Sequence, residues 1–330
     1  MGLEEIPMSA LNQPHFQDAD KARQYLERIQ WPNGPICPHC GSVSEDHYRL
    51  AGKAHRAGLM KCKDCRQQFS VTVHTVFERS KIKLNVWLQA VFLLCSSKKG
   101  MSAHQLHRVL GVTYKTAWFM AHRIREAFRD AMPGVMGGGG GPVEVDETYY
   151  GKAKGARVRR FRYGPKVSGT GGMHLRKIVS LVDRQGATRS FHIASIDAKN
   201  LKPILQAHIA KQAKVYTDTA GHYKRMGLAK EYAAHETVNH SIGEYARPGG
   251  IHSNTVESYF GLLKRGLYGT YHHVSEAHLQ RYLQEFDFRH THRTAAGVND
   301  TERAIKALSQ IRGKRLTYRR INGQQAAQID

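Results

Sequence analysis

Apolar residues recur at helical spacing in four segments of the first 130 positions of the chain. Before the third helical segment stands Ser102, whose hydroxyl can accept a hydrogen bond from the free amides of a first turn. A break at Gly111 separates that segment from a fourth. The predicted helices cover residues 15–31, 84–94, 102–110 and 114–128. Helices should therefore precede and follow residues 33–76, which lack this spacing.

Beyond residue 142 the pattern changes to short apolar or alternating runs mixed with helical ones. The predicted strands cover residues 143–148, 177–183, 189–195, 214–218 and 235–238. The predicted helices cover residues 200–212, 252–266 and 275–289. Three strands, a helix, a strand and further helices are typical of an α/β domain with a mixed sheet flanked by helices.

The run "PGVMGGGGGP" at residues 133–142 separates the two patterns. Five consecutive glycines favour neither helix nor strand, so we expect a flexible linker. The chain is thus predicted to be multidomain. The expected segments are an N-terminal helical segment (1–32), a ribbon (33–76), a helical region (77–132), the linker (133–142), an α/β domain (143–295) and a basic C-terminal tail (296–330).

The third and fourth helices form a helix-turn-helix pattern, because a short turn with a glycine joins them and the second is rich in polar and basic residues. An ordinary helical hairpin is the alternative. In a helix-turn-helix, the residues that begin the second helix meet base edges, and more basic positions on it meet phosphates. The expected DNA-contacting residues here are Thr113, Tyr114, Lys115, Thr116 and Arg123.

Charge supports a polyanionic partner. The sequence has 50 Lys and Arg against 27 Asp and Glu, a formal net charge of +23 and a pI near 9.9. A membrane is the poorer candidate, because the longest apolar run has ten residues and the acidic N-terminus lacks a signal-peptide core. We therefore expect a cytoplasmic, DNA-associated protein.

The segment between the first two strands is the most basic part of the chain. Residues 151–177 hold nine lysines or arginines and one histidine, with no acid. Such a loop is expected to order on a phosphate backbone, with Arg159 and Arg160 among its contacts.

Four of the five cysteines form two Cys-x-x-Cys pairs, "CPHC" and "CKDC", with 21 residues between them. Two such pairs can complete a tetrahedral zinc site, in which the ion has a structural role. Two disulfides or a redox pair are the alternatives. The predicted zinc ligands are Cys37, Cys40, Cys62 and Cys65, whereas Cys95 lies in an apolar helix and is expected in the core.

Three acids lie on three different predicted elements. Strand alternation puts Glu144 and Asp146 on one face of the first strand, and Asp218 ends the strand 214–218. Glu257 lies on the helix 252–266, on a polar face shared with Asn254 and, seven residues later, a lysine. Each acid alone could be a surface residue or a helix cap. Together they suit hard divalent cations. Two such metal ions about 4 Å apart can promote phosphodiester chemistry.

Three blocks of sequence carry a family resemblance: "VEVDETYYG", "VYTDTAGHY" and "HSNTVESYFGLLKRGLYGTYHHVS". They resemble the signature blocks of bacterial insertion-sequence DDE transposases, in the group with an N-terminal zinc ribbon and an integrase-like catalytic domain. The ribbon, the segment "SKKGMSAHQLHRVLGVTYKTAWFMAHRIR" and the closing "EFDFRHTHR" are similar too. The resemblance covers roughly residues 15–295.

This resemblance implies a ribonuclease-H-like fold with Asp146, Asp218 and Glu257 as ligands of two Mg²⁺ or Mn²⁺ ions. It implies that Lys264 contacts the end of the mobile element, with Arg265 beside it. Some members are described with asparagine as the third catalytic residue, which makes Asn254 the alternative to Glu257.

The implied reaction is hydrolysis at each element end, followed by attack of the freed 3′-hydroxyl on target DNA, with no covalent protein intermediate. The partners would be double-stranded DNA, both element ends and target, bound by a homodimer or higher oligomer. A structure-specific nuclease or a domesticated DNA-binding regulator without catalysis are the alternatives. A zinc-ribbon transcription factor would leave residues 143–330 unexplained.

Overall fold

The computed structural model describes residues 10–129, 134–154, 174–184 and 186–317. The chain divides into two compact units. The first comprises residues 1–129 together with 298–330, and the second comprises residues 130–297. The predicted multidomain organisation is therefore observed, although the C-terminal segment belongs to the same unit as the N-terminal half.

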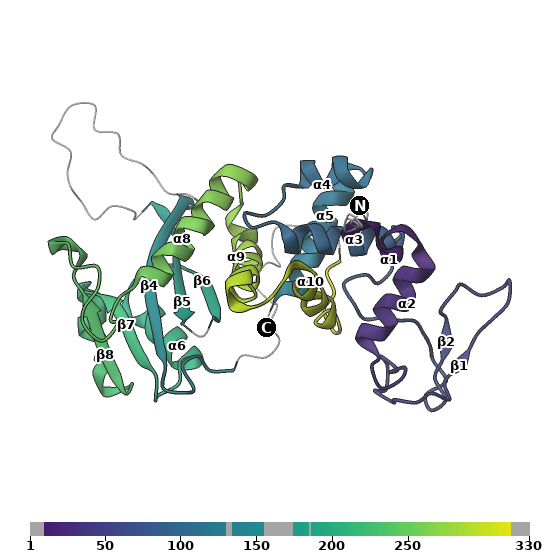
Figure 1. The fold of residues 1–330 in the computed structure, drawn as a ribbon, viewed down its shortest axis with the longest axis horizontal. Helices are drawn as coiled ribbons and strands as arrows, with labels where there is room; N and C mark the ends of the chain where they lie inside the picture. The colour runs from purple at the N-terminus through teal and green to yellow at the C-terminus, as the bar shows by residue number, and fades with distance from the viewer. Residues whose placement is uncertain (1–9, 130–133, 155–173, 185, 318–330) are drawn as a thin grey trace, which may run out of the picture. The chain divides into compact units, whose positions relative to one another are not determined.

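The first unit combines helices with a small antiparallel sheet in the order β1-β2-β3, of which Figure 1 labels β1 and β2. Its strands are β1 (Tyr48–Arg49), β2 (Met60–Lys61) and β3 (Gln68–Phe69). Its α-helices are α1 (Pro14–Gln17), α2 (Ala19–Gln30), α3 (Leu84–Ser96), α4 (Ala103–Leu110), α5 (Tyr114–Phe128) and α10 (Asp300–Ser309), and a 3-10 turn, η1, spans Ala10–Asn12. Where one helix was expected over 15–31, the extended backbone of Asp18 separates α1 from α2, and its carboxylate caps α2 by accepting from Lys21 N at 2.8 Å.

Helix α3 lies at the centre of this unit, and its buried face includes Leu88, Leu94 and Cys95. Cys95 is thus a core residue, as expected. The residues predicted as a basic tail include α10, whose Arg303 donates to the Cys95 carbonyl oxygen at 2.9 Å while Leu308 is buried. Among the helices of the described ranges, none has both the length and the apolarity that crossing a bilayer requires.

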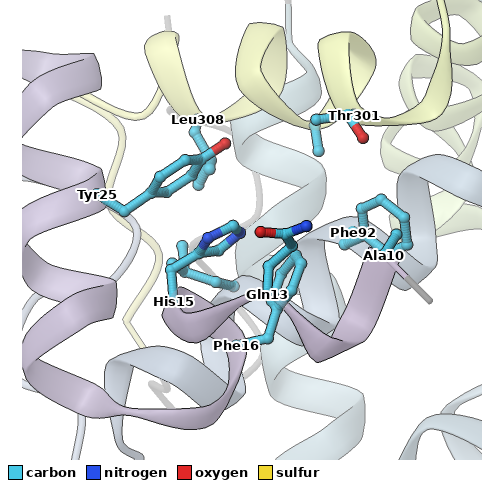
Figure 2. Close-up of a pocket in the computed structure, with 10 residues that line it drawn as sticks. Ala10, Gln13, His15, Phe16, Tyr25, Phe92, Thr301 and Leu308 are labelled. Carbon is cyan, nitrogen blue, oxygen red and sulfur yellow. The ribbon is translucent and has the colours of Figure 1, made fainter. Parts of the chain in front are cut away.

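A cavity of about 240 Å³ lies among α1, α2, α3 and α10 (Figure 2). His15 stacks on Tyr25 along its wall, with ring centroids 3.9 Å apart, and Phe16 and Phe92 also line it. Its lining contains none of the residues that the sequence marks as candidates for chemistry or DNA contact.

The second unit is built on a five-stranded mixed sheet in the order β6-β5-β4-β7-β8 (Figure 1). The strands are β4 (Pro142–Lys152), β5 (Leu175–Asp183), β6 (Thr188–Ile193), β7 (Lys214–Asp218) and β8 (Ala234–Val238). β4, β5 and β6 pair antiparallel, whereas β4, β7 and β8 pair parallel. All five strands were predicted from the sequence.

Helices cover both faces of this sheet. One apolar core joins alternate strand residues, such as Val143 and Val215, to α6 (Ala198–His208) and α7 (Gly221–Met226). The opposite core joins Tyr150 and Ile178 to α8 (Asn254–Gly266) and α9 (Glu276–Thr291). The short helical turns of this unit are η2 (Leu228–Lys230), η3 (His240–Ile242), a π-turn η4 (Leu267–Tyr271) and η5 (Thr294–Ala296). A mixed sheet with helices on both faces fits the ribonuclease-H-like expectation.

The glycine run is part of the second unit in its described residues, 134–141, rather than a free linker. The Gly137 amide donates to Asp183 Oδ2 at 2.9 Å, and Met136 forms a bridge with Ile209. Gly137 has a φ of +71°, and a Cβ there would come 2.4 Å from the Ala213 side chain. Glycine is required here for close approach and left-handed backbone, which the expectation of flexibility missed.

Candidate active site

Asp146 and Asp218 lie on adjacent parallel strands, Asp146 in the middle of β4 and Asp218 at the carboxyl end of β7. The ladder of β4 and β7 pairs Glu144 with Tyr216, and Asp146 and Asp218 each follow by two residues. Because side chains alternate along a strand, both acids lie on the sheet face that carries α8. Helix α8 packs on this face through Val256, whose neighbour in sequence is Glu257.

Glu257 lies in the first turn of α8, where its side chain is 42% exposed. Its Oε1 is 3.0 Å from His240 Nε2, and the same nitrogen is 2.9 Å from Ser253 Oγ. Asn254, the alternative third ligand, is the first residue of α8 and is exposed.

The ionisation of Asp146 reflects its burial and the acids around it. Burial raises the pKa of Asp146 to about 7, and the negative charges of Glu147, Asp218 and Glu257 act in the same direction. The Glu147 amide, which donates to Asp146 Oδ1 at 2.7 Å, opposes that shift in pKa. A group of neighbouring carboxylates that repel one another is stabilised by a cation, and oxygen ligands suit Mg²⁺ or Mn²⁺. These residues therefore fit a divalent ion.

Distances between possible ligand atoms distinguish this site from the cysteine cluster. Across the described part of the chain, only the four cysteines bring three or more ligand atoms within 4.8 Å of one another. The three carboxylates are more widely spaced, on neighbouring elements.

Glu147, His222 and Tyr223 extend the site in a way that the sequence analysis missed. The Tyr223 hydroxyl donates to Glu147 Oε1, which also lies 3.2 Å from His222 Nε2. Burial lowers the pKa of His222, but the hydrogen bond and charge of Glu147 outweigh it, so the pKa is raised. The sequence signal for His222 and Tyr223 was the "TAGHY" turn after Asp218, because residues that follow the end of a strand commonly line a functional site.

The two basic candidates on α8 are Lys264 and Arg265, both exposed in its last turns. Lys264 follows Glu257 by seven residues, almost two helical turns, so the two side chains share one helix face. Arg159 and Arg160 lie outside the described residues.

The four cysteine sulfurs gather as predicted. Cys37 Sγ lies 3.6 Å from Cys65 Sγ, and Cys40 Sγ lies 3.6 Å from Cys62 Sγ. These separations exceed the disulfide bond length of about 2.05 Å, and all four thiols are free. Four thiolates at such spacing can hold one tetrahedral zinc ion.

The predicted helix pair forms, with the predicted capping. Ser102 accepts from Gln105 N at 3.2 Å, and Gly111 ends α4 with a left-handed φ of 64°. Thr113 caps α5 by accepting from Thr116 N at 3.2 Å, so these two hydroxyl residues have a structural role. The observed fold of this helix pair leaves its contact with DNA as a prediction.

The first turn of α5 exposes the next two candidates. Lys115 is exposed, and Tyr114 is 44% exposed with its ring stacked on His104 at 4.2 Å. Arg123 differs, because it is only 5% exposed. Its Nη2 donates to the Glu78 carbonyl oxygen at 2.7 Å and its guanidinium lies over Trp87. This placement favours a structural role for Arg123 rather than the expected DNA contact.

Two domain families match this chain. Residues 139–291 match the ISXO2-like transposase domain, and residues 17–68 match the transposase zinc-ribbon domain. An uncharacterized protein in the transposable element ISH50 of Halobacterium salinarum is 30% identical over 281 residues, which cover 83% of this chain and 91% of that protein.

A solved structure, the simian T-cell lymphotropic virus intasome in complex with PP2A regulatory subunit B56 gamma, is similar at 16% identity over 51% of this chain and 56% of that chain. The TM-score of this similarity is 0.26. The domain matches and the ISH50 relative confirm the resemblance that the sequence blocks indicated. This chain belongs to the insertion-sequence transposases that combine a zinc ribbon with an ISXO2-like transposase domain.

Proposed function

We propose that this transposase cuts DNA strands at the ends of its element and joins the freed 3′-hydroxyl to target DNA. One observation carries the proposal: Asp146 and Asp218 follow the same ladder pair on adjacent strands, and Glu257 is close enough to help raise the pKa of Asp146. An acidic cluster inside a protein of net charge +23 is the arrangement expected where phosphodiesters must be both attracted and cleaved.

Asp146, Asp218 and Glu257 would hold Mg²⁺ or Mn²⁺. When bound, these ions supply Lewis-acid activation of the scissile phosphodiester and stabilise the developing charge on its oxygens.

The chain itself supplies positioning. β4 and β7 hold two of the acids on a paired sheet, where their backbone cannot drift apart without breaking the ladder. Glu147 is fixed by Tyr223 and His222, so the backbone that carries Asp146 is held from the opposite face of the sheet. Lys264, on the same face of α8 as Glu257, would hold a DNA phosphate beside the reacting one.

Binding to double-stranded DNA would begin with other parts of the chain. The exposed first turn of α5, with Tyr114 and Lys115, is the proposed base-reading edge of a helix-turn-helix. The ribbon would hold zinc as a structural ion. Because two element ends must be cut and joined together, we propose that a homodimer or larger assembly acts on DNA.

The test is incubation of the purified protein with DNA from the flanks of its own gene and Mg²⁺. Wild-type protein should nick at fixed positions and join the resulting 3′ ends to a target plasmid. Asp146→Asn and Asp218→Asn should bind the same DNA without nicking it, whereas Asp20→Asn, at an exposed carboxylate on α2, should behave as wild type. Nicks without joined products would indicate a nuclease, and binding without nicks a regulator.

A further inference from the structure

Glu144 is a fully buried acid two residues before Asp146 on β4. The two side chains leave the strand on the same face, but only Asp146 lies in the acidic cluster. A buried carboxylate is strongly destabilising unless hydrogen bonds and opposite charge surround it. The groups that contact the Glu144 carboxylate therefore indicate its role.

Those partners come from the start of α8. Glu144 Oε2 accepts from the backbone amides of Thr255 at 2.9 Å and Val256 at 3.0 Å. Its Oε1 accepts from Thr255 Oγ1 at 2.9 Å and lies 3.2 Å from His252 Nδ1.

Helix α8 has no cap of its own. Ser253 occupies the N-cap position but makes no side-chain capping hydrogen bond, although the first amides of any helix need acceptors. Glu144 supplies them from the neighbouring strand, with a negative charge at the positive end of the helix. A carboxylate on β4 thus replaces the usual local cap.

Arg184 completes the arrangement. Its Nε donates to Glu144 Oε1 at 2.8 Å, while its Nη1 and Nη2 donate to the carbonyl oxygens of Gly250 and His252 at 2.6 and 3.1 Å. The guanidinium also lies 5.1 Å from the ring centroid of Tyr216, on β7. The Glu144–Arg184 pair therefore contacts β4, β7 and the segment that enters α8.

We infer that Glu144 is a positioning residue for Glu257, an inference that rests on the proposed function. Glu144 is bonded to the amide of Val256, the residue immediately before Glu257, and is two residues from Asp146. It therefore fixes the start of α8, and with it Glu257, relative to the strand that carries Asp146. Loss of the cap would let the first turn of α8 fray and move Glu257 away from the other two acids.

The test compares Glu144→Gln with Glu257→Gln in the full-length protein. Glu144→Gln preserves size but removes the charge and turns an amide NH₂ group toward a donor, so the cap is weakened. Glu231→Gln is the matched control, because Glu231 pairs with Lys202 of α6, the helix that packs on the opposite face of the sheet from α8. Thr255→Val, which removes one bond to Glu144 and keeps the charge, is a milder second variant should Glu144→Gln fold poorly.

Two measurements without DNA decide the matter. In hydrogen exchange, the backbone amides of residues 253–258 should exchange at least about tenfold faster in Glu144→Gln than in the wild type. The increase should be smaller in Thr255→Val. The amides of the sheet should stay protected, and Glu257→Gln should keep wild-type protection over residues 253–258. In titrations with Mn²⁺ alone, followed by electron paramagnetic resonance, Glu144→Gln should weaken affinity about 10–100-fold, as expected for loss of a residue that orients a ligand.

Wild-type protection of residues 253–258 in both Glu144→Gln and Thr255→Val would overturn the inference. So would wild-type Mn²⁺ affinity in Glu144→Gln when Glu257→Gln has lost it. If even the wild-type protein neither binds Mn²⁺ nor cleaves DNA, the proposed function has failed. Hydrogen exchange then decides alone whether Glu144 positions α8.

Discussion

The Tyr259 hydroxyl donates a hydrogen bond to Asp287 Oδ1, with 2.7 Å between the oxygens, in the interior between α8 and α9. The same carboxylate accepts from Ser190 N at 2.8 Å and Ser190 Oγ at 2.6 Å, so it ties both helices to β6. Burial nevertheless raises the pKa of Asp287 to about 7, which its hydrogen bonds only partly oppose. The helix that carries Glu257 thus depends on a group that titrates near neutral pH.

This pKa predicts a pH-dependent stability of the second unit. The folded state holds the Asp287 proton up to about pH 7, whereas the unfolded chain releases it near 3.8. The stabilisation is therefore fully present below about pH 4 and is lost as pH rises toward 7. His290, whose pKa burial lowers to about 4, acts in the opposite direction below pH 6.5.

Comparing Asp287→Asn with wild type isolates the contribution of Asp287, because His290 is present in both. In urea unfolding between pH 4.5 and 8, the free energy of unfolding of the wild type should fall relative to that of Asp287→Asn as pH rises. Parallel curves for the two proteins would contradict the assignment.

The zinc ribbon provides the second prediction. Cys62→Ser should lose the one zinc ion per chain and unfold the ribbon, since thiolate ligands supply much of the folding energy of such sites. Residues 134–297 should stay folded, because they belong to the other unit. Zinc content and hydrogen exchange, resolved by unit, are the measurements.

Cys95→Ala is the matched control for Cys62→Ser, since Cys95 is buried but lies outside the cysteine cluster. It should keep its zinc. A reduced, folded wild-type sample without zinc would be incompatible with a structural zinc site.

Arg123 gives the third prediction. Removing its guanidinium from Trp87 and the Glu78 carbonyl oxygen should destabilise the first unit by about 1–3 kcal/mol. Arg123→Ala should accordingly lower the urea midpoint yet retain DNA affinity at a temperature where the protein is folded. Lys115→Ala should weaken DNA affinity and make its salt dependence shallower. A shallower salt dependence of DNA binding in Arg123→Ala would restore the role that the sequence indicated.

The sequence predicted the sheet and the placement of its acids for a physical reason. Alternation along β4 and the end of β7 are local properties, and parallel neighbours bring Asp146 and Asp218 together without further information. Alternation cannot distinguish Asp146 from Glu144, because both leave the strand on the same face. Only the packing of α8, whose Thr255 lies 111 residues after Glu144, buries Glu144 completely and leaves Asp146 partly buried.

Other differences have the same long-range origin. Arg123 lies on a helix rich in basic residues, and only the packing of α3 shows that its side chain is buried. The glycine run is indistinguishable from a linker until Gly137 meets Ala213. Helix α10 could have been found, because Ala304, Ala307 and Leu308 recur at helical spacing within the segment predicted as a tail.

The identity of the third ligand is the fourth prediction. Glu257→Gln should abolish cleavage, because a neutral amide is a much poorer ligand for a hard cation than a carboxylate. Asn254→Ala, one turn earlier on α8, should reduce activity only modestly through positioning. Cleavage assays in Mg²⁺ and in Mn²⁺ compare the two. An active Glu257→Gln beside an inactive Asn254→Ala would move the ligand to Asn254.

The last prediction concerns Lys264, which shares a face of α8 with Glu257 but is not among the proposed metal ligands. Lys264→Ala should retain Mn²⁺ binding but lose affinity for element ends, since one phosphate contact disappears. The slope of log affinity against log salt should become shallower by about one. Lys199→Ala, at an exposed lysine of α6 on the opposite side of the sheet, is the matched control and should leave the slope unchanged. Equal slopes for Lys264→Ala and wild type would show that this lysine does not hold the phosphate, and would shift attention to Arg265 beside it.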